Sequence, residues 1–287
     1  MFISEKLKNN DVTVSFEIFP PKKEISMDSV FGITKELTQL KPEFISVTYG
    51  AGGGTSKNTV KIASHIQNEL NTTALAHLTC VSSTEKEIDD IITQLKENKI
   101  ENVLALRGDI PKDSDFPRDN HFNYAYQLIN KLKACGDFCI GAACYPEGHI
   151  ECQNKEIDIK FLKQKVDCGV DFLTTQMFFD NNVLYSFLYR ALANGIDVPV
   201  VAGIMPVTNA KQIARSCQLS GTTLPPKFKT IVGKFGNNPE AMKQAGIAYA
   251  IDQIVDLIAN GVKGIHIYTM NRPEIAREIM RNISDLI

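Results

Sequence analysis

The sequence predicts a (β/α)8 TIM barrel, a closed ring of eight parallel strands inside a ring of helices, formed by a single domain over residues 1–287. Eight short runs rich in Val, Ile, Phe and Thr alternate with segments of helical periodicity. Strands that alternate with helices pair in parallel through right-handed crossovers. The 287 residues also suit this fold, which typically needs about 250. An open, doubly wound sheet is the alternative, because it uses the same alternation.

The strand and helix units follow one another without a break in composition. We expect strands at the β-branched and aromatic runs 12–19, 43–50, 73–80, 102–109, 138–149, 171–176, 199–206 and 263–270. We expect helices at the amphipathic segments 27–40, from 56, from 84, 124–133, 155–168, 181–194, from 209 and from 273. Between 218 and 259, LPPKF and GNNPEAM flank extra helical sequence. This interval predicts a helical insertion before the eighth strand and no second domain.

Composition excludes several classes of function. The 31 Lys and Arg residues nearly balance 33 Asp and Glu, so no basic surface is expected for nucleic acid or an anionic membrane. No apolar run reaches the roughly 18 residues of a membrane span, and MFISEKLKNN lacks the apolar stretch of a secretory signal. The seven cysteines form no C-x-x-C pair and no zinc pattern with histidine. We therefore expect free thiols in a reducing cytoplasm and no metal site.

Polar side chains gather at the carboxyl ends of the expected strands, where this fold builds its active sites. Strands buried on both faces tolerate few such groups, so their repetition around the ring favours a wide polar pocket over isolated core residues. These residues are Glu17, Thr48, Tyr49, His77, Thr79, Arg107, Asp109, Tyr145, Glu147, His149, Gln176, Tyr268 and Arg272.

Glu17 is the candidate acid of this pocket. Strand alternation places it on the face opposite Phe16, and because helices cover the apolar face, Glu17 points into the barrel mouth. Apolar neighbours, including Phe19 and two prolines, should remove water from the carboxyl and raise its pKa. A carboxyl that stays protonated near neutral pH can act as a general acid. The alternative is a structural ion pair with Arg107 or Arg272.

Asp109 follows Gly108 at the exit of the fourth strand, where a glycine lets the backbone approach a ligand closely. An aspartate near an electron-rich ring opposes further negative charge there, which makes a reduced cofactor a better donor. The alternative is an N-cap or turn aspartate. The segment GAGGGTSK at 50–57 matches no phosphate-loop pattern, and we expect a flexible loop that leads into a helix.

Eight motifs occur in series: FEIFPP, SVTYG, AHLTC, ALRGD, AACYPEGH, KVDCGVDFLTTQMFFD, GIMPV and HIYTMNR. Together they cover nearly the whole chain and resemble the 5,10-methylenetetrahydrofolate reductase family. The resemblance implies a flavoprotein of one-carbon metabolism on a (β/α)8 barrel. It implies that NADH, or alternatively NADPH, reduces bound FAD, and that the hydride then passes to methylenetetrahydrofolate in a ping-pong reaction that yields 5-methyltetrahydrofolate.

The resemblance also implies residue roles. Glu17 would be the general acid that opens the five-membered ring of the folate, and Asp109 would lie beside the flavin pyrimidine and the pterin. Positions on the substrate side are Glu17, Gln176, Gln212, Tyr268 and Arg272. Positions that hold FAD are Thr48, His77, Leu106, Arg107, Gly108, Asp109, Tyr124, Ala125, Ala143, Tyr145, His149, Asp158 and Lys165.

Three positions depart from the family pattern. Phe161 and Gln164 replace a polar and a basic residue, so fewer charges should face the FAD diphosphate, and Ser216 replaces an aromatic residue over the ligand. The chain ends soon after the eighth helix, so the C-terminal regulatory domain of eukaryotic members is not expected. By resemblance to the family, we expect a homo-oligomer.

Two other functions remain open. Another FAD-dependent barrel oxidoreductase, such as a proline dehydrogenase-like enzyme, would take electrons from an amine in place of NADH. A non-catalytic flavin or folate carrier has no use for an acid in an apolar pocket, so Glu17 and Asp109 together favour an enzyme.

Overall fold

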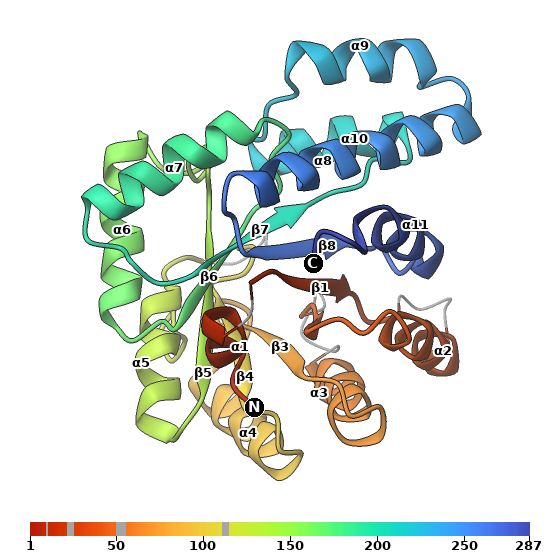
Figure 1. The fold of residues 1–287 in the computed structure, drawn as a ribbon. Coiled ribbons are helices and arrows are strands. Elements are labelled where there is room, and N and C mark those ends of the chain that lie inside the picture. Colours follow the sequence, from red (N-terminus) through yellow and green to blue (C-terminus); the bar gives the residue numbers. More distant parts are fainter. Residues whose placement is uncertain (10, 22–25, 50–55, 111–114) are drawn as a thin grey trace.

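The computed structural model describes residues 1–9, 11–21, 26–49, 56–110 and 115–287. Its strands are β1 (Thr13–Ile18), β2 (Phe44–Val47), β3 (Ala74–Thr79), β4 (Asn102–Leu106), β5 (Cys139–Cys144), β6 (Phe172–Thr175), β7 (Val200–Ile204) and β8 (Gly264–Tyr268). They pair in parallel in chain order, and β8 closes the ring against β1 (Figure 1). The predicted (β/α)8 barrel is confirmed.

The helices in the described ranges follow the expected order. They are α1 (Ile3–Asn9), α2 (Met27–Thr38), α3 (Ser56–Ser64), the π-helical turn η1 (His65–Glu69), α4 (Glu85–Glu97), α5 (Ala125–Cys135), α6 (Lys155–Asp167), α7 (Asn181–Ala193), α8 (Ala210–Ser220), α9 (Pro226–Phe235), α10 (Pro239–Ala259) and α11 (Pro273–Ile283). The sequence did not predict α1 or η1. Of the segment at 50–57, residues 50–55 lie outside the described residues, and α3 begins at Ser56.

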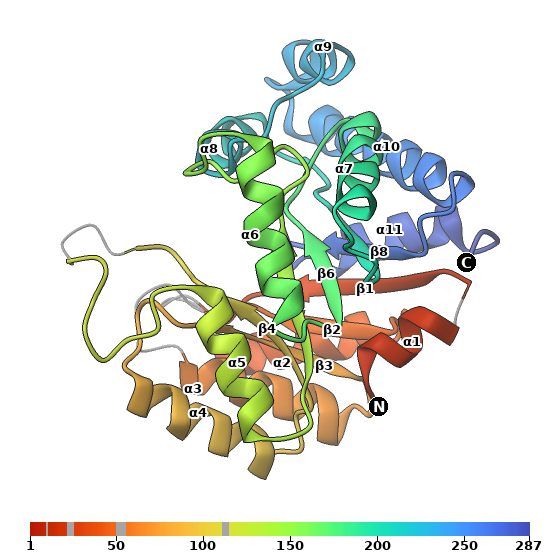
Figure 2. The same cartoon turned by 90° about the vertical axis from the view of Figure 1, so that its left-hand side faces the viewer.

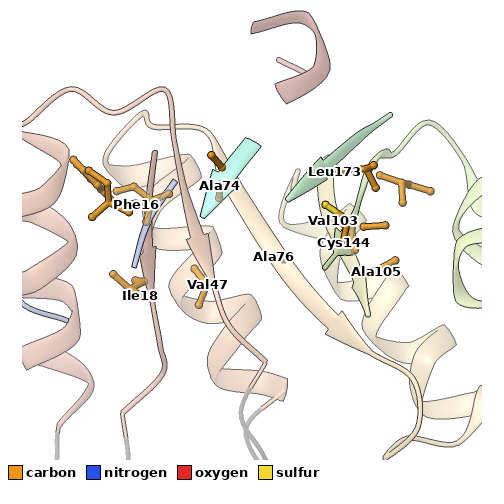
Figure 3. Packing of buried hydrophobic residues seen from close by; sticks show 14 of the residues in the cluster. Phe16, Ile18, Val47, Ala74, Ala76, Val103, Ala105, Cys144 and Leu173 are labelled. Atoms are coloured by element: carbon orange, nitrogen blue, oxygen red, sulfur yellow. The ribbon is translucent and has the colours of Figure 1, made fainter. Parts of the chain in front are cut away.

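The outward faces of the strands form the main hydrophobic core with the helices. Phe16 and Ile18 of β1 and Val47 of β2 are fully buried in this core (Figure 3). Because side chains alternate along a strand, their burial turns Ser15 and Glu17 toward the barrel interior. The side chains of β1 that the sequence predicts to face the barrel interior therefore do so in the structure.

Helix α1 closes the amino end of the barrel. Its Ile3 and Leu7 are buried in a second cluster together with inward side chains of the strands, namely Phe44, Leu75, Leu104, Cys139, Phe172 and Val201. The Ile3 amide also donates to the Asn102 side-chain oxygen at 2.9 Å. Figure 2 shows α1 on the side opposite residues 115–123, which precede α5. The polar residues at the strand carboxyl ends therefore occupy the other end of the barrel.

The helical insertion precedes β8, as predicted, but its expected boundaries were wrong. Helix α10 contacts both α7 and α11, and its Ile247 and Ile254 are buried in the main core. Helices α8 and α9 instead use Ile213 and Phe228 in a separate cluster with Met242. The helix that covers the seventh strand is therefore α10, and the extra helices are α8 and α9. Pro and Gly signals mark where helices end, whereas burial decides which of them covers the barrel.

No helix in the described ranges is long and apolar enough to cross a membrane. All seven cysteines are free thiols. Burial raises the pKa of Cys80 and of Cys144 to about 12, so these two thiols stay protonated and unreactive.

Candidate active site

Glu17 lies near the carboxyl end of β1, between polar residues of both neighbouring strands. The strand register places Glu17 beside Ser46 of β2 and places Ser15 beside His266 of β8. Strand β3 brings His77 to the same place, with its Nε2 3.6 Å from Glu17 Oε2. The barrel therefore gathers one carboxyl and two imidazoles from β1, β3 and β8.

A chain of hydrogen bonds links Glu17 to His266. Ser46 Oγ donates to Glu17 Oε2 at 3.4 Å and lies 3.1 Å from His266 Nε2. His266 Nε2 is itself 3.6 Å from the same carboxylate oxygen. On the other side of the imidazole, Ser15 Oγ lies 2.7 Å from Nδ1. The two serines and His266 are buried, whereas the Glu17 side chain is 21% exposed.

The pKa of Glu17 corrects the prediction. Burial raises it, as its position in the barrel implies, but His266 Nε2 at 3.6 Å, the positive charge that either histidine gains on protonation and the hydrogen bond from Ser46 bring it below the ordinary value. The expected raised pKa is therefore wrong for the ligand-free chain. The prediction counted the apolar neighbours of Glu17 and missed the inward-facing His266 and Ser46.

His77 carries a buried nitrogen that faces the Glu17 carboxylate at 3.6 Å without a hydrogen bond. Burial lowers the pKa of His77 to about 4, an effect that the Glu17 carboxylate opposes and His266 reinforces. The imidazole is therefore neutral at neutral pH. Its Nε2 is buried and has no hydrogen-bond partner among the described residues. Because an unpaired buried polar atom costs free energy, this nitrogen suits a polar group of a bound molecule.

Tyr268 lies beside His266 at the end of β8. Its hydroxyl donates to the Thr175 carbonyl oxygen at 2.6 Å, and its ring meets His266 edge-on at 5.5 Å. Burial raises the pKa of Tyr268 well above 10, so the hydroxyl remains protonated. Gly203 of β7 makes room for this ring, because a Cβ there would lie 2.8 Å from Tyr268 Cε2.

A second group of predicted residues lies at the ends of β4 and β5. Both terminal nitrogens of Arg107 bind the Glu151 carboxylate, at 2.6 and 2.8 Å. This pairing is the first cause of a raised Arg107 pKa, to which the charges of Tyr145 and Asp109 add. The Tyr145 ring packs edge-on against His149 at 4.6 Å. Arg107 therefore pairs with a rim carboxylate and not with the candidate acid.

Lys165 of α6 is a partly buried cation behind this second group. Its Nζ donates to the Ala143 carbonyl oxygen at 2.7 Å. Asp158 lies two helical turns earlier on the same face of α6. Burial lowers the pKa of Lys165 and raises that of Asp158, although the two attract each other. The departing residues Phe161 and Gln164 are both exposed.

Gly108 has a backbone requirement of its own. Its φ is +85°, and a Cβ would lie 2.9 Å from Thr79 Cβ. Glycine is therefore needed at this turn whether or not a ligand approaches it. Leu106 ends β4 and packs against the inner cluster that α1 closes. Asp109, which follows, is exposed at the rim.

Gln176 follows β6 and Arg272 follows β8, so β7 lies between their two strands. Arg272 donates to Thr208 Oγ1 at 3.0 Å and to Glu274 at 2.9 Å, so it does not form the alternative ion pair with the candidate acid. The Gln176 side-chain oxygen accepts from the Met177 amide at 2.9 Å. Its side chain is only partly buried, so the amide can also reach a ligand.

The other predicted residues lie at the rim or at the beginnings of helices. Thr48 follows β2 at the rim, and Tyr124 and Ala125 form the beginning of α5, with Tyr124 46% exposed. Gln212 is exposed in the first turn of α8, and Ser216 follows one turn later. Among the described contacts, none joins Gln212 or Tyr124 to the groups at the strand ends.

Sequence reasoning missed the partnership of Ser15, Ser46 and His266 with the acid. A signal for two of them was present, because Ser15 precedes Glu17 by two residues and His266 precedes Tyr268 by two. Residues two apart on a strand share a face, so both belong to the inward face of the barrel. The partnership with Ser46 depends on strand register, which one strand's sequence does not contain.

Taken together, an acid–base group at the carboxyl ends of β1, β3 and β8 and a cationic group at β4 and β5 define a barrel enzyme with its site at the usual end of the fold. A family model described as methylenetetrahydrofolate reductase matches residues 2–284. The chain belongs to this oxidoreductase family, as its motifs indicated.

Individual relatives agree with this assignment. The 5,10-methylenetetrahydrofolate reductase of Pectobacterium carotovorum subsp. carotovorum is 36% identical over 272 residues, which cover 95% of the chain and 90% of that protein. A probable methylenetetrahydrofolate reductase (NADH) of Oryza sativa subsp. japonica is 35% identical over 294 residues, 98% of the chain and 50% of that protein. A solved Clostridium thermocellum protein that binds two copies of 5-methyl-5,6,7,8-tetrahydrofolic acid has a TM-score of 0.63 at 13% identity, with 99% of the chain and 100% of that protein covered. This last likeness shows the fold alone.

Proposed function

We propose that the chain reduces 5,10-methylenetetrahydrofolate to 5-methyltetrahydrofolate, with electrons that enter from NADH or NADPH and pass through bound FAD in two half-reactions. The observation that carries the proposal is the carboxyl of Glu17, held by a buried histidine and a serine at the barrel rim of a reductase-family chain. Bound FAD would supply the hydride carrier that connects the two substrates. The name of the rice relative favours NADH as the donor.

The residues at the rim fit a flavin dinucleotide. Its diphosphate needs cations and hydrogen-bond donors, which Arg107, His149 and Lys165 can provide. The unpaired His77 Nε2 offers a further polar contact. Asp109, exposed at the exit of β4, would oppose added negative charge on the flavin ring and favour a cationic folate beside it.

Glu17 would donate the proton that opens the five-membered ring of the folate and leaves a reactive iminium. The carboxyl must be protonated for this step, although its pKa is low in the ligand-free chain. A folate over the rim would remove water from the 21% of the side chain that is exposed, which disfavours the carboxylate. Gln176 would orient each substrate in turn through its side-chain amide.

The two half-reactions separate the roles in anaerobic stopped flow. Replacing Glu17 with Gln should slow folate reduction by about 100-fold or more while NADH still reduces the flavin. Replacing Asp109 with Asn should slow the folate step and not abolish it. Glu17 is not the acid if the Glu17→Gln variant reduces folate at the parental rate. A preparation that neither contains FAD nor binds it when added would refute the proposed function altogether.

We also propose, on the resemblance, that the chain forms a homo-oligomer and, on its scattered cysteines, that it acts in the cytoplasm. Light scattering on the purified protein measures the first point directly. The mass of a single chain at micromolar concentration would contradict self-association.

A further inference from the structure

We propose that His266 stores the proton that Glu17 delivers, so that the pair shares one proton. This proton is bound to the imidazole while the Glu17 carboxyl is exposed to water, and it moves through the Ser46 hydroxyl to Glu17 when a substrate covers the carboxyl. The inference deepens the proposed function, because it rests on Glu17 as the general acid. It makes His266 a positioning residue that acts through Glu17.

The contacts of Ser15 bear on which imidazole nitrogen of His266 gains or loses the proton. Ser15 Oγ lies 2.7 Å from His266 Nδ1 and 3.2 Å from the Ile265 carbonyl oxygen. We assign Ser15 as the acceptor from Nδ1–H, because its single hydroxyl hydrogen can then be donated to the Ile265 carbonyl oxygen. Nδ1 is then protonated throughout, and Nε2, which faces Ser46 and Glu17, is the nitrogen that gains or loses a proton.

Both positions of the shared proton leave every group satisfied. In the first, Nε2–H donates to Ser46 Oγ, and the Ser46 hydroxyl donates to the Glu17 carboxylate. In the second, the Nε2–H bond has broken and Ser46 has taken that proton while giving its own to Glu17. Ser46 then donates to the neutral imidazole and accepts from the carboxylic acid. The imidazolium and carboxylate become two neutral groups, with no charge or proton lost.

Burial leaves Glu17 as the only described path between this proton and solvent. His266, Ser15 and Ser46 are at most 1% exposed, against 21% for the Glu17 side chain. After Glu17 gives its proton to a substrate, the pair is therefore recharged through Glu17 once the product leaves.

The surroundings of His266 leave Glu17 as its only described charge partner. The titratable groups that face it are Glu17 of β1, His77 of β3 and Tyr268 of β8. Strand β2 contributes Ser46 and the ring of Phe44, which stacks on His266 at 5.7 Å, and β7 contributes a glycine at the paired position. His77 is neutral and Tyr268 protonated at neutral pH, so only Glu17 offers a compensating charge.

Nitrogen NMR of histidine-labelled full-length protein tests the proposal without turnover. Near neutral pH, His266 should show two protonated nitrogens, and Glu17→Gln should lower the doubly protonated fraction at a given pH about tenfold or more. His77→Gln is the matched control, because His77 lies at the same 3.6 Å from Glu17 but has no serine link to it, and it should change the His266 signal far less than Glu17→Gln does. Adding 5-methyltetrahydrofolate should remove the Nε2 proton. A His266 that is neutral in the parent, or equally protonated in the parent and in the Glu17→Gln variant, would overturn the proposal.

Kinetic measurements provide a second test of the proposal. Replacing His266 with Gln should move the alkaline limit of the folate step to lower pH by about one unit or more, because the shared proton is then held by Glu17 alone. A slower rate with an unchanged pH profile would indicate a merely structural residue and overturn the proposal. If this variant does not fold, the NMR comparison still decides. If the chain shows no folate activity but the NMR result holds, the proposed function fails and the shared proton stands.

Discussion

Replacing Gly246 with Ala should destabilise the chain, although alanine favours helices. Gly246 lies within α10, where a Cβ would overlap the carbonyl oxygen of Val207 and come within 2.6 Å of the carbonyl carbon. Because the clash is with backbone just after β7, relief requires the helix and the strand exit to move apart. Helix propensity gains about 1 kcal/mol, whereas an extra carbon in such a contact costs about 3 kcal/mol.

The free energy of unfolding should therefore fall by about 2 kcal/mol in this variant. Urea titration followed by circular dichroism measures the change as a lower midpoint at unchanged slope. The matched control is Gly233→Ala in α9, where no atom beyond the adjacent residues and the helix's own backbone lies within 4 Å of the added Cβ, and stability should rise by up to about 1 kcal/mol. Effects of the same sign would refute the reasoning that α10 lies directly against the exit of β7.

The Gly246→Ala substitution should also affect the active site. Thr208 follows Val207 directly and accepts a hydrogen bond from Arg272 at 3.0 Å. A displaced Val207 would therefore move Arg272, and the KM for the folate should rise more than kcat falls. The Gly233→Ala control should leave both constants unchanged.

Two further substitutions test charge at the site. The pKa of His77 is lowered from 6.5 to about 4, so the unfolded chain binds more protons between these values and stability falls as the pH falls from 6.5 to 4. His77→Gln should remove this loss of about 3 kcal/mol, and identical pH dependence of the urea midpoint in both proteins would contradict it. Lys165→Met should weaken FAD binding about tenfold or more in a fluorescence titration. Lys163→Met on the same helix, whose ammonium pairs with Asp167, should bind FAD as the parent does.

The barrel itself was predictable because its periodicities are local. A run such as 12–19 alternates with period two, and 27–40 has a helical period, so both element types follow from short stretches of sequence. The order of these elements then leaves few topologies. The insertion was harder, since both α8 and α10 follow β7 with helical sequence, and the burial of Ile254 in the main core shows that α10 covers the strands.

The candidate site was predictable in its residues and less so in its electrostatics. Alternation placed Glu17 in the barrel mouth, and the structure confirms that direction. Its pKa depends instead on His266 and Ser46, from strands on either side of β1 that are far apart in the sequence. Such pairings arise from register and closure of the ring, which no single strand specifies.

Closure of the barrel by α1 determines where small molecules can enter it. Ile3 and Leu7 block the amino end with apolar side chains, so a molecule that reaches the interior must pass the strand carboxyl ends. In the proposed reaction, donor, acceptor and product would then use one entrance, and each would have to leave it before the next arrives. A single inhibitor lodged in that entrance would compete with all three.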